Sequence, residues 1–340
     1  MQNFPLSKRS HVSSRRPIGC ATNKNILNNK KYQNWFTARF GLTTFENEMK
    51  WYSTEPSQGK DYSVADAMLQ FMKQNRIAVR GHNIFWDDPK YQPGWLNSLS
   101  PLALRLAVEK RAKSVVTRYK GQLIAWDVIN ENLHFLSLKT KWEQMHPKWL
   151  LKEKGDQVSS PANYLKKLRE IQSSLSKGAR VAIGLESHFP VPNIPYMRAS
   201  IDKLAAAGVP IWLTEVDVEK GPSQALFLEQ VLREGHSHPK VGGIVIWGAW
   251  SPQGCYRMCL TDNNFNNLPT GNVVDKLLIE WGRRKLQATT DDNGFFEVSL
   301  SHGDYEVKVN HPTIKSSSLV HTLTIVPSRN SSTVLLRDSP

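Results

Sequence analysis

The stretch IAWDVINE, residues 124–131, is an apolar run that ends in an amide and a carboxylate, Asn130 and Glu131. Its residues favour extended backbone, so we predict a β-strand here. A glutamate at the end of an apolar strand is costly to bury without partners, because desolvation disfavours its charged form. Either Glu131 sits at an exposed strand end, or the protein uses the altered proton affinity of a desolvated carboxyl group. The rest of the sequence has to distinguish these alternatives.

Other short apolar runs share this pattern and alternate with segments of helical periodicity. They cover residues 17–22, 42–47, 78–86, 179–189, 209–218 and 241–250. Repeated strand–helix units favour an α/β fold in which parallel strands close into a (β/α)8 TIM barrel. Only seven strands are recognisable, and the gap falls between residues 132 and 178, where KTKWEQMHPKWLLKEKGDQ (139–157) has the pattern of a charged helix. We therefore predict an incomplete barrel that lacks one strand.

The ends of the chain differ from this middle part. Residues 1–16 are predicted to be a basic tail, and residues 17–285 to be the barrel. Residues 286–340 alternate between apolar and polar side chains in FFEVSL, DYEVKV, HTLTIV and STVLL, with turn signals between them, which predicts a small antiparallel β extension. Asn330 begins a glycosylation sequon.

Composition limits the partners. The formal charge of +14 suggests an anionic partner such as an acidic polysaccharide. The basic residues are scattered without a zinc-finger or helix-turn-helix pattern, so no nucleic acid is predicted. No apolar run is long enough for a transmembrane helix, and no signal peptide is visible. Of the three cysteines, Cys255 and Cys259 either pair across a loop or stay reduced, like Cys20.

In a barrel of this kind the reactive groups lie at the carboxyl ends of the strands. Any single polar residue there is more often a helix cap, an ion-pair member or a packing residue. The combination is more informative, because two glutamates, Glu131 and Glu215, end two well-separated strands. The candidates at these ends are Glu46, Asn47, Lys50, His82, Trp86, Asn130, Glu131, Glu186, His188, Glu215, Asp217 and Trp247.

Two carboxyl groups beside tryptophans, amides and histidines are typical of glycoside cleavage. One carboxylic acid protonates the leaving oxygen while a second carboxylate attacks the anomeric carbon. Tryptophan rings offer flat faces to sugars, and amides, lysine and histidine bind hydroxyl groups. No Cys/His metal cluster and no Gly-rich phosphate loop is found, so neither a metal nor another cofactor is predicted.

Five ordered motifs resemble the strand ends of glycoside hydrolase family 10, the endo-β-1,4-xylanases, and are closest to its plant branch. They are TTFENEMKW (43–51), RGHNIFWDD (80–88), WDVINENLHF (126–135), LESHF (185–189) and WLTEVDV (212–218). The resemblance implies a monomeric, retaining hydrolase of xylan or xylo-oligosaccharides that works outside the cell or in the cell wall.

The resemblance also assigns roles by position. It makes Glu131 the general acid/base, Glu215 the nucleophile, and Asn130 the amide that binds the sugar 2-hydroxyl. His188 and Asp217 would keep the nucleophile ionised and oriented. The residues matched to sugar-binding positions are His82, Trp86, Glu46, Asn47, Lys50, Trp247 and Glu186.

One departure from the family leaves the function open. The family's fifth strand ends in an Asn-(Asp/Glu)-Tyr-Asn motif, and neither that motif nor its strand is recognisable here. The chain is therefore either an active endo-xylanase or a sugar-binding, catalytically impaired homologue. A different barrel glycosidase, such as a β-glucanase, is a third alternative.

Overall fold

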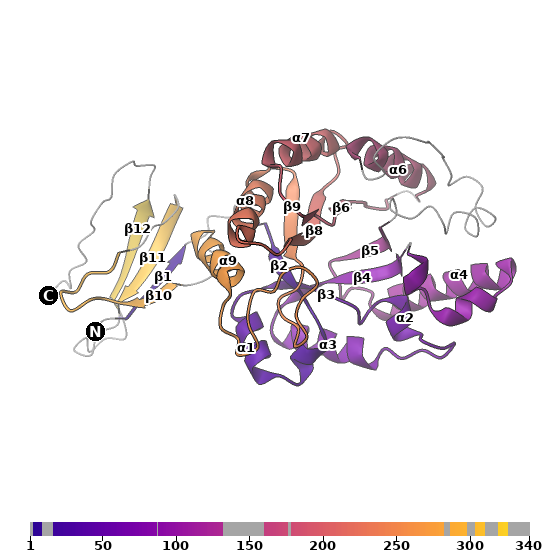
Figure 1. Ribbon diagram of the computed structural model, residues 1–340, viewed down its shortest axis with the longest axis horizontal. Coiled ribbons are helices and arrows are strands. Elements are labelled where there is room, and N and C mark those ends of the chain that lie inside the picture. Colours follow the sequence, from indigo (N-terminus) through magenta and orange to yellow (C-terminus); the bar gives the residue numbers. More distant parts are fainter. Residues whose placement is uncertain are drawn as a thin grey trace. The chain divides into compact units, whose positions relative to one another are not determined.

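The structure of the chain is a computed structural model, which describes residues 3–8, 16–86, 88–131, 160–175, 178–281, 286–297, 303–309 and 319–325. The chain divides into two compact units (Figure 1). The larger unit is Arg16–Thr270, and the smaller one combines Met1–Arg15 with Gly271–Pro340. The described residues include no helix that is both long and apolar enough to cross a membrane.

The larger unit is built around a sheet of parallel strands in the order β5-β4-β3-β2-β9-β8-β6, with the short β7 paired to β8. The pairing of β2 with both β3 and β9 joins the first strand of the barrel to the last. This arrangement confirms the predicted α/β barrel. The strands are β2 (Ile18–Thr22), β3 (Leu42–Phe45), β4 (Ala78–Trp86), β5 (Ala125–Asn130), β6 (Ile183–Leu185), β7 (His188–Phe189), β8 (Ile211–Val218) and β9 (Val241–Ile246).

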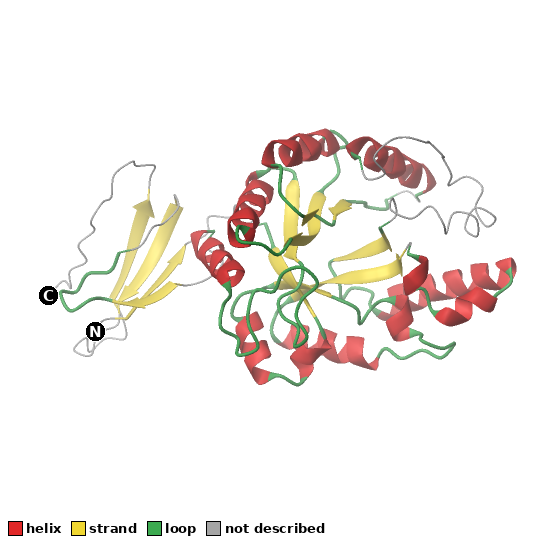
Figure 2. Ribbon diagram, in the orientation of Figure 1, coloured by secondary structure: helices red, strands yellow, loops and turns green. Residues whose placement is uncertain are grey.

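Helices alternate with these strands and lie outside them (Figure 2). In several of them a polar side chain caps the first turn. Ser100 and Asn193 each accept a hydrogen bond from a backbone N–H three residues on, and a proline sits in the first turn after each. In the described part of the chain the α-helices are α1 (Lys30–Thr37), α2 (Trp51–Thr54), α3 (Ser63–Gln74), α4 (Pro101–Arg118), α6 (Pro161–Ser174), α7 (Ile194–Ala205), α8 (Gln224–Ser237) and α9 (Pro269–Glu280). The short 3-10 helices are η1 (Lys24–Leu27), η2 (Pro89–Tyr91) and η3 (Gly94–Ser98).

Glycines in the strands make room for large aromatic neighbours. A Cβ atom on Gly81 would lie 2.3 Å from the Trp126 ring, and one on Gly243 would lie 2.3 Å from the Trp212 ring. Any side chain at either glycine would displace a ring of the adjacent strand. The Gly81–Trp126 contact therefore keeps β4 close to β5, and the Gly243–Trp212 contact keeps β9 close to β8.

The barrel has one seam among the described residues, because β5 pairs only with β4 and β6 pairs only with β8. Between these strands the structure describes Glu131 and residues 160–175 and 178–182, and they contain α6 but no strand. Residues 132–159, where the charged helix is predicted, lie outside the described residues. Val128 and Ile129 of β5 remain 54% and 47% exposed. The prediction of seven recognisable strands is confirmed.

The smaller unit contains an antiparallel sheet in the order β10-β1-β11-β12. Its strands are β1 (Asn3–Lys8), β10 (Leu286–Thr289), β11 (Gly303–Val309) and β12 (Leu319–Ile325). The predicted strands DYEVKV and HTLTIV fall in β11 and β12.

Other details of the smaller unit differ from the sequence prediction. Residues 1–16 were expected to be a tail, but Asn3–Lys8 forms a strand between β10 and β11. The pattern missed it because NFPLSK carries a proline and polar residues that weaken the strand signal. The division between the units falls at Gly271, before most of α9, and not at residue 286. Residues 295–297 of FFEVSL are described and form no strand. The STVLL run and the Asn330 sequon lie outside the described residues.

Candidate active site

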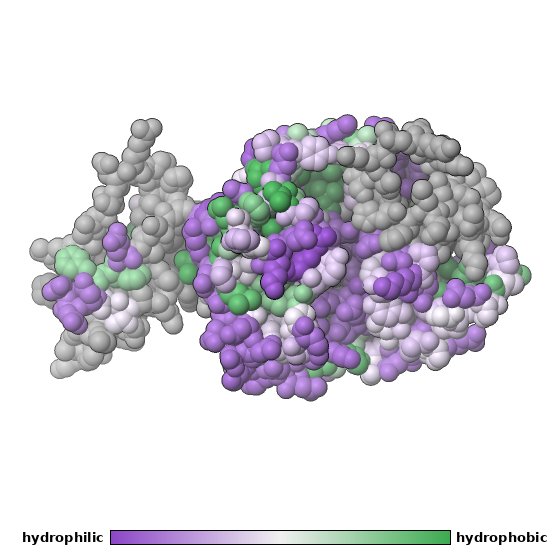
Figure 3. Space-filling model, viewed as in Figure 1, coloured by the Kyte–Doolittle hydropathy of each residue, from purple (hydrophilic) through white to green (hydrophobic). Residues whose placement is uncertain are grey.

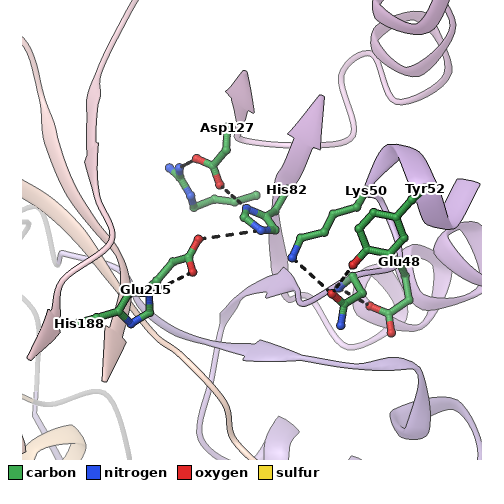
Figure 4. Close-up of polar contacts among 9 residues, drawn as sticks. Glu48, Lys50, Tyr52, His82, Asp127, His188 and Glu215 are labelled. Atoms are coloured by element: carbon green, nitrogen blue, oxygen red, sulfur yellow. Dashed lines mark hydrogen bonds and ion pairs between the residues drawn. The ribbon is translucent and has the colours of Figure 1, made fainter. Parts of the chain in front are cut away.

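Glu215 of β8 lies between two histidines at the carboxyl ends of the strands (Figure 4). Its Oε1 is 3.9 Å from Nε2 of His82 on β4, and its Oε2 is 3.5 Å from Nε2 of His188 on β7. The Glu215 side chain is only 9% exposed. Since β4 and β8 are separated by three other strands in the sheet order, these contacts cross the mouth of the barrel. The carboxylate is thus held in a defined position between two imidazole nitrogens.

His188 links Glu215 to a second carboxylate. Its Nδ1 is 2.9 Å from Oδ1 of Asp217, which follows Glu215 by two residues and is almost fully buried. Burial by itself lowers the pKa of His188, but hydrogen bonds and charges from Asp217 and Glu215 outweigh it and raise the pKa to about 10. His188 is therefore an imidazolium at neutral pH, and its two ring nitrogens face the carboxylates of Asp217 and Glu215.

His82 is held by a buried ion pair that the sequence analysis did not include. Its Nδ1 lies 3.1 Å from Oδ2 of Asp127 on the neighbouring strand, and Asp127 also pairs with Arg80. Burial alone would raise the pKa of Asp127, but the Arg80 charge and the His82 hydrogen bond outweigh it, and the pKa is lowered. An ionised Asp127 can only accept, so His82 donates its Nδ1 proton to it. Among the described residues the buried Nε2 of His82 has no hydrogen-bond partner, which leaves it available to a ligand.

Lys50 brings a positive charge to the same mouth of the barrel. Its side chain is 4% exposed, and its Nζ lies 4.2 Å from the centre of the Trp86 ring and 3.3 Å from Oδ1 of Asn47. Burial lowers the pKa of Lys50, while nearby carboxylates, Glu215 and Glu131 among them, oppose that shift. Both glutamates therefore lie within electrostatic reach of one ammonium group.

Aromatic rings surround these polar groups. Trp86 stacks on Tyr91 with ring centres 4.2 Å apart and planes 6° from parallel. The Trp247 ring, which follows β9, lies 5.2 Å from the His82 ring. Among the described residues the buried Nε1 of Trp86 has no hydrogen-bond partner. Flat rings beside unsatisfied donors suit a ligand that has both apolar faces and hydroxyl groups, as a sugar has.

Comparison with known proteins agrees with this interpretation. The model of the family described as "Glycosyl hydrolase family 10" matches residues 7–150. "Endo-1,4-beta-xylanase 5" of Arabidopsis thaliana is 40% identical over 91% of this chain and 59% of its own length. The chain belongs to glycosyl hydrolase family 10.

Further relatives and a solved structure match most of this chain. The family 10 chain spans about three fifths of the length of the Arabidopsis thaliana relatives it matches first. "Anti-sigma-I factor RsgI6" of Acetivibrio thermocellus is 33% identical over 87% of this chain and 41% of its own length. Among solved structures, xylanase 10B from Thermotoga petrophila RKU-1 in complex with xylobiose has a TM-score of 0.64 and 21% identity, and it covers 81% of this chain and 99% of its own. That likeness supports the barrel fold.

Glu131, the predicted acid/base of the family 10 site, follows β5 directly. Its backbone φ is 55°, in the left-handed region that glutamate rarely adopts. The neighbouring Asn130 is the last residue of β5 and is buried. Unusual backbone conformations of this kind concentrate at functional sites. Glu131 thus lies at the carboxyl end of β5, where the sequence analysis expects the acid/base.

The predicted outer sugar-binding residues lie after β3. Burial and the charge of Glu48 raise the pKa of Glu46 to about 7, although the Asn23 amide, 3.4 Å away, partly opposes this. Glu48 was not predicted, and it accepts hydrogen bonds from the backbone N–H groups of Lys24 and Asn47. The signal that could have found it is the second glutamate of the motif ENE, which stands directly beside two predicted site residues.

Glu186 contacts a different part of the barrel from the Glu215 cluster. It follows β6, and its charge reaches Tyr164 of α6, whose pKa burial and this charge raise to about 12. Sequence analysis did not single out Tyr164, because a tyrosine in an amphipathic helix usually indicates packing.

The sequence left the pairing of the cysteines open. Cys255 and Cys259 form a disulfide, while Cys20 is a buried free thiol. In the described part of the chain, no group of three or more His, Cys, Asp or Glu side chains is arranged to hold a metal ion.

Proposed function

We propose that this chain hydrolyses internal β-1,4-xylosidic bonds of xylan by a retaining, two-step mechanism. The single observation that supports this most strongly is the setting of Glu215. The carboxylate is nearly buried, yet it lies beside the imidazolium of His188 and across from His82. A nucleophilic carboxylate has to be ionised and fixed in place, and this setting provides both conditions.

In the first step Glu215 attacks the anomeric carbon. The bond between that carbon and the glycosidic oxygen breaks, and Glu131 gives its proton to the leaving oxygen. This leaves a covalent glycosyl-enzyme and an ionised Glu131. In the second step Glu131 takes a proton from water, the water oxygen attacks the anomeric carbon, and Glu215 leaves as a carboxylate. Glu131 is then protonated again, so both glutamates return to their starting states.

The aromatic and polar side chains around Glu215 would hold the sugar. Trp86 and Trp247 would contact the ring faces, while His82 Nε2 and Lys50 Nζ would bind hydroxyl groups. On the face of the larger unit seen in Figure 3 hydrophilic side chains predominate and hydrophobic ones gather in small patches. A surface of this kind suits a hydrated polymer.

The proposed substrate also fits the charge of the chain. A formal charge of +14 would attract a xylan that carries acidic side groups. We propose that the chain acts as a monomer outside the cell or in the cell wall, where such a polysaccharide is found. Several relatives of this chain in Arabidopsis thaliana carry the name endo-1,4-beta-xylanase, which supports xylan as the substrate.

The stereochemistry of the product tests the two-step mechanism. Retaining enzymes hold their two carboxyl groups about 5–5.5 Å apart, whereas inverting enzymes need about 6.5–9.5 Å for an intervening water. We expect NMR spectra recorded early in xylohexaose hydrolysis to show the β-anomer before mutarotation, and a crystal structure to show the short separation of Glu131 and Glu215. Early release of the α-anomer would remove the nucleophile assignment.

A leaving-group comparison tests Glu131. Replacing Glu131 by Ala removes the acid that protonates the leaving oxygen, so xylan hydrolysis should fall by roughly 10²–10⁴-fold. An aryl xylobioside with a nitrophenolate leaving group needs no protonation, so its first step should be nearly unaffected. Steady-state and burst kinetics on both substrates measure the difference. Equal losses on both would make Glu131 a structural residue.

Sugar binding without turnover is a second candidate function. The observation that favours it is the seam next to β5, because the strand that carries Glu131 at its end lacks a paired neighbour on one side among the described residues. A relative named as an anti-sigma factor is also 33% identical over 87% of this chain. Calorimetric binding of xylohexaose without release of reducing ends, measured on the same preparation, would establish this alternative.

A further inference from the structure

The loop after β9 carries an arginine toward the buried carboxylate of Asp217. This loop, residues 255–259, is closed by the disulfide between Cys255 and Cys259, and Arg257 stands at its middle. Arg257 Nε lies 3.9 Å from Oδ1 of Asp217. The distance is that of an ion pair and not of a hydrogen bond, so the guanidinium acts on Asp217 mainly through its charge.

A second contact fixes the same loop to the strand of the nucleophile. The side-chain amide of Gln224, the first residue of α8, donates to the backbone oxygen of Arg257 at 3.2 Å and to that of Val218 at 2.8 Å. Val218 directly follows Asp217 in β8. One amide thus ties the backbone of Arg257 to the end of β8, so the position of the arginine does not depend on the 3.9 Å contact alone.

The charges around Asp217 do not balance without this arginine. Asp217 is 1% exposed, and the cations near its Oδ1 are His188, at 2.9 Å, and Arg257, at 3.9 Å. His188 contacts both Asp217 and Glu215, so one imidazolium faces two carboxylates. Buried charges are tolerated when they are paired. A second cation is required, and Arg257 is the one that contacts Asp217.

We infer that Arg257 is a positioning residue for the proposed nucleophile. Its guanidinium compensates part of the negative charge of Asp217. The positive charge of His188 is then free to stabilise the carboxylate of Glu215. The inference rests on the proposed function, because it assigns Arg257 a part in keeping the proposed nucleophile ionised. Arg257 touches neither substrate nor reacting atoms in this role.

Other charged groups face the same cluster and have to be considered. Glu215 is contacted by His82 as well as His188, and Lys50 is within electrostatic reach. His82 is in turn held by Asp127, which pairs with Arg80. Among these groups Arg257 is the cation that contacts Asp217 without contacting Glu215 in any described ion pair, and its side chain is 27% exposed. Its replacement is therefore the least disruptive way to change the charge of the cluster.

The test compares Arg257→Gln with Arg257→Lys and with Arg233→Gln. Arg233 is a partly exposed arginine of α8 that pairs with Glu229 on the same helix, so its variant controls for loss of one positive charge elsewhere. The first readout is the pH dependence of kcat/KM on xylohexaose, whose acid limb reports the ionisation of the free enzyme. The second is the imidazole ¹⁵N spectrum of His188 through an alkaline titration, which requires no activity.

Loss of a nearby cation makes a carboxylate harder to ionise and an imidazolium harder to deprotonate. We expect Arg257→Gln to move the acid limb up by roughly 0.5–1 pH unit and to raise the pKa of His188 by a similar amount. The loss in kcat/KM should shrink as pH rises. Arg257→Lys should restore most of both shifts, and Arg233→Gln should produce neither. An unmoved acid limb and an unmoved His188 titration in Arg257→Gln would overturn the inference. If the wild-type chain hydrolyses no xylan, the proposed function fails, and the His188 titration still decides the role of Arg257.

Discussion

Replacing Glu215 by Gln is expected to abolish xylan hydrolysis while leaving xylo-oligosaccharide binding nearly intact. An amide has the size of a carboxyl group and keeps an oxygen that can accept from His188, but it cannot form the glycosyl-enzyme. Removal of a nucleophile costs on the order of 10⁴-fold or more in kcat. The dissociation constant of xylohexaose should change by less than about threefold, since one net charge among many contacts is lost. Reducing-end release and calorimetry on the same samples measure the two quantities.

The chain offers a matched control for this experiment. Glu234 of α8 is also a buried glutamate, and it pairs with Arg198 at 2.8 Å, outside the set of strand ends. Glu234→Gln makes the same chemical change in a similar environment, so it should cost some stability and leave kcat close to wild type. If Glu215→Gln keeps a kcat within about tenfold of wild type, Glu215 is not the nucleophile.

The strand ends explain why so much of this site could be predicted from sequence. Glu131 follows β5, and Glu215 follows the apolar start of β8, while His82 lies within β4. Parallel strands bring such positions to one mouth of the barrel. The alternation of side chains along a strand also placed Asp217 on the face of Glu215. These inferences need only the two-residue alternation of side chains along a strand and the parallel direction of the strands.

Other residues of the site could not be predicted in this way. Asp127 and Arg80 lie within strands, where a charged residue signals nothing until its partner on the neighbouring strand is known. Their pairing depends on the register of β4 against β5, in which His82 faces Asp127. Tyr91 supports Trp86 from a short 3-10 helix that has no period to recognise. Arg257 lies in a disulfide-closed loop, and loop geometry does not follow from pattern. Sequence analysis therefore finds what repeats along a strand and misses what depends on register.

The seam is expected to limit both stability and turnover, and a chain with a complete barrel should exceed this one in both. The change is the insertion of a full strand–helix unit between about Phe135 and Ser159, with the sequence pattern of the family's fifth unit. In the described part of the chain β5 and β6 each pair on one side only, so their second edges have no ladder of hydrogen bonds there. Val128 and Ile129 of β5 are about half exposed, an unusual state for apolar residues of a barrel strand.

The size of the effect follows from the groups that a new strand would satisfy. A buried backbone group without a partner costs about 1–3 kcal/mol, so a few pairs gained along the new ladder should add at least about 3 kcal/mol to the free energy of unfolding. For a domain of this size that corresponds to a rise in Tm of roughly 6–12 °C. The proposed site should gain as well, because catalytic groups need a fixed separation and Glu131 follows a strand at the seam. The inserted unit would also return the family's tyrosine to the region of the nucleophile.

A control insertion separates strand completion from added length. An equally long Gly/Ser segment at the same point adds residues without strand or helix, so it should leave Tm and kcat unchanged or lower them. Thermal unfolding by calorimetry and kcat on xylohexaose are measured for the three chains. If the strand–helix insertion raises neither Tm nor kcat above the original chain, then the edges of β5 and β6 are already satisfied by residues beyond those described. In that case the seam has no energetic cost, and the proposal of a catalytically impaired homologue loses its physical basis. If it raises Tm but not kcat, the seam weakens the fold and turnover is limited elsewhere, at Glu131 or in the loops that hold the sugar.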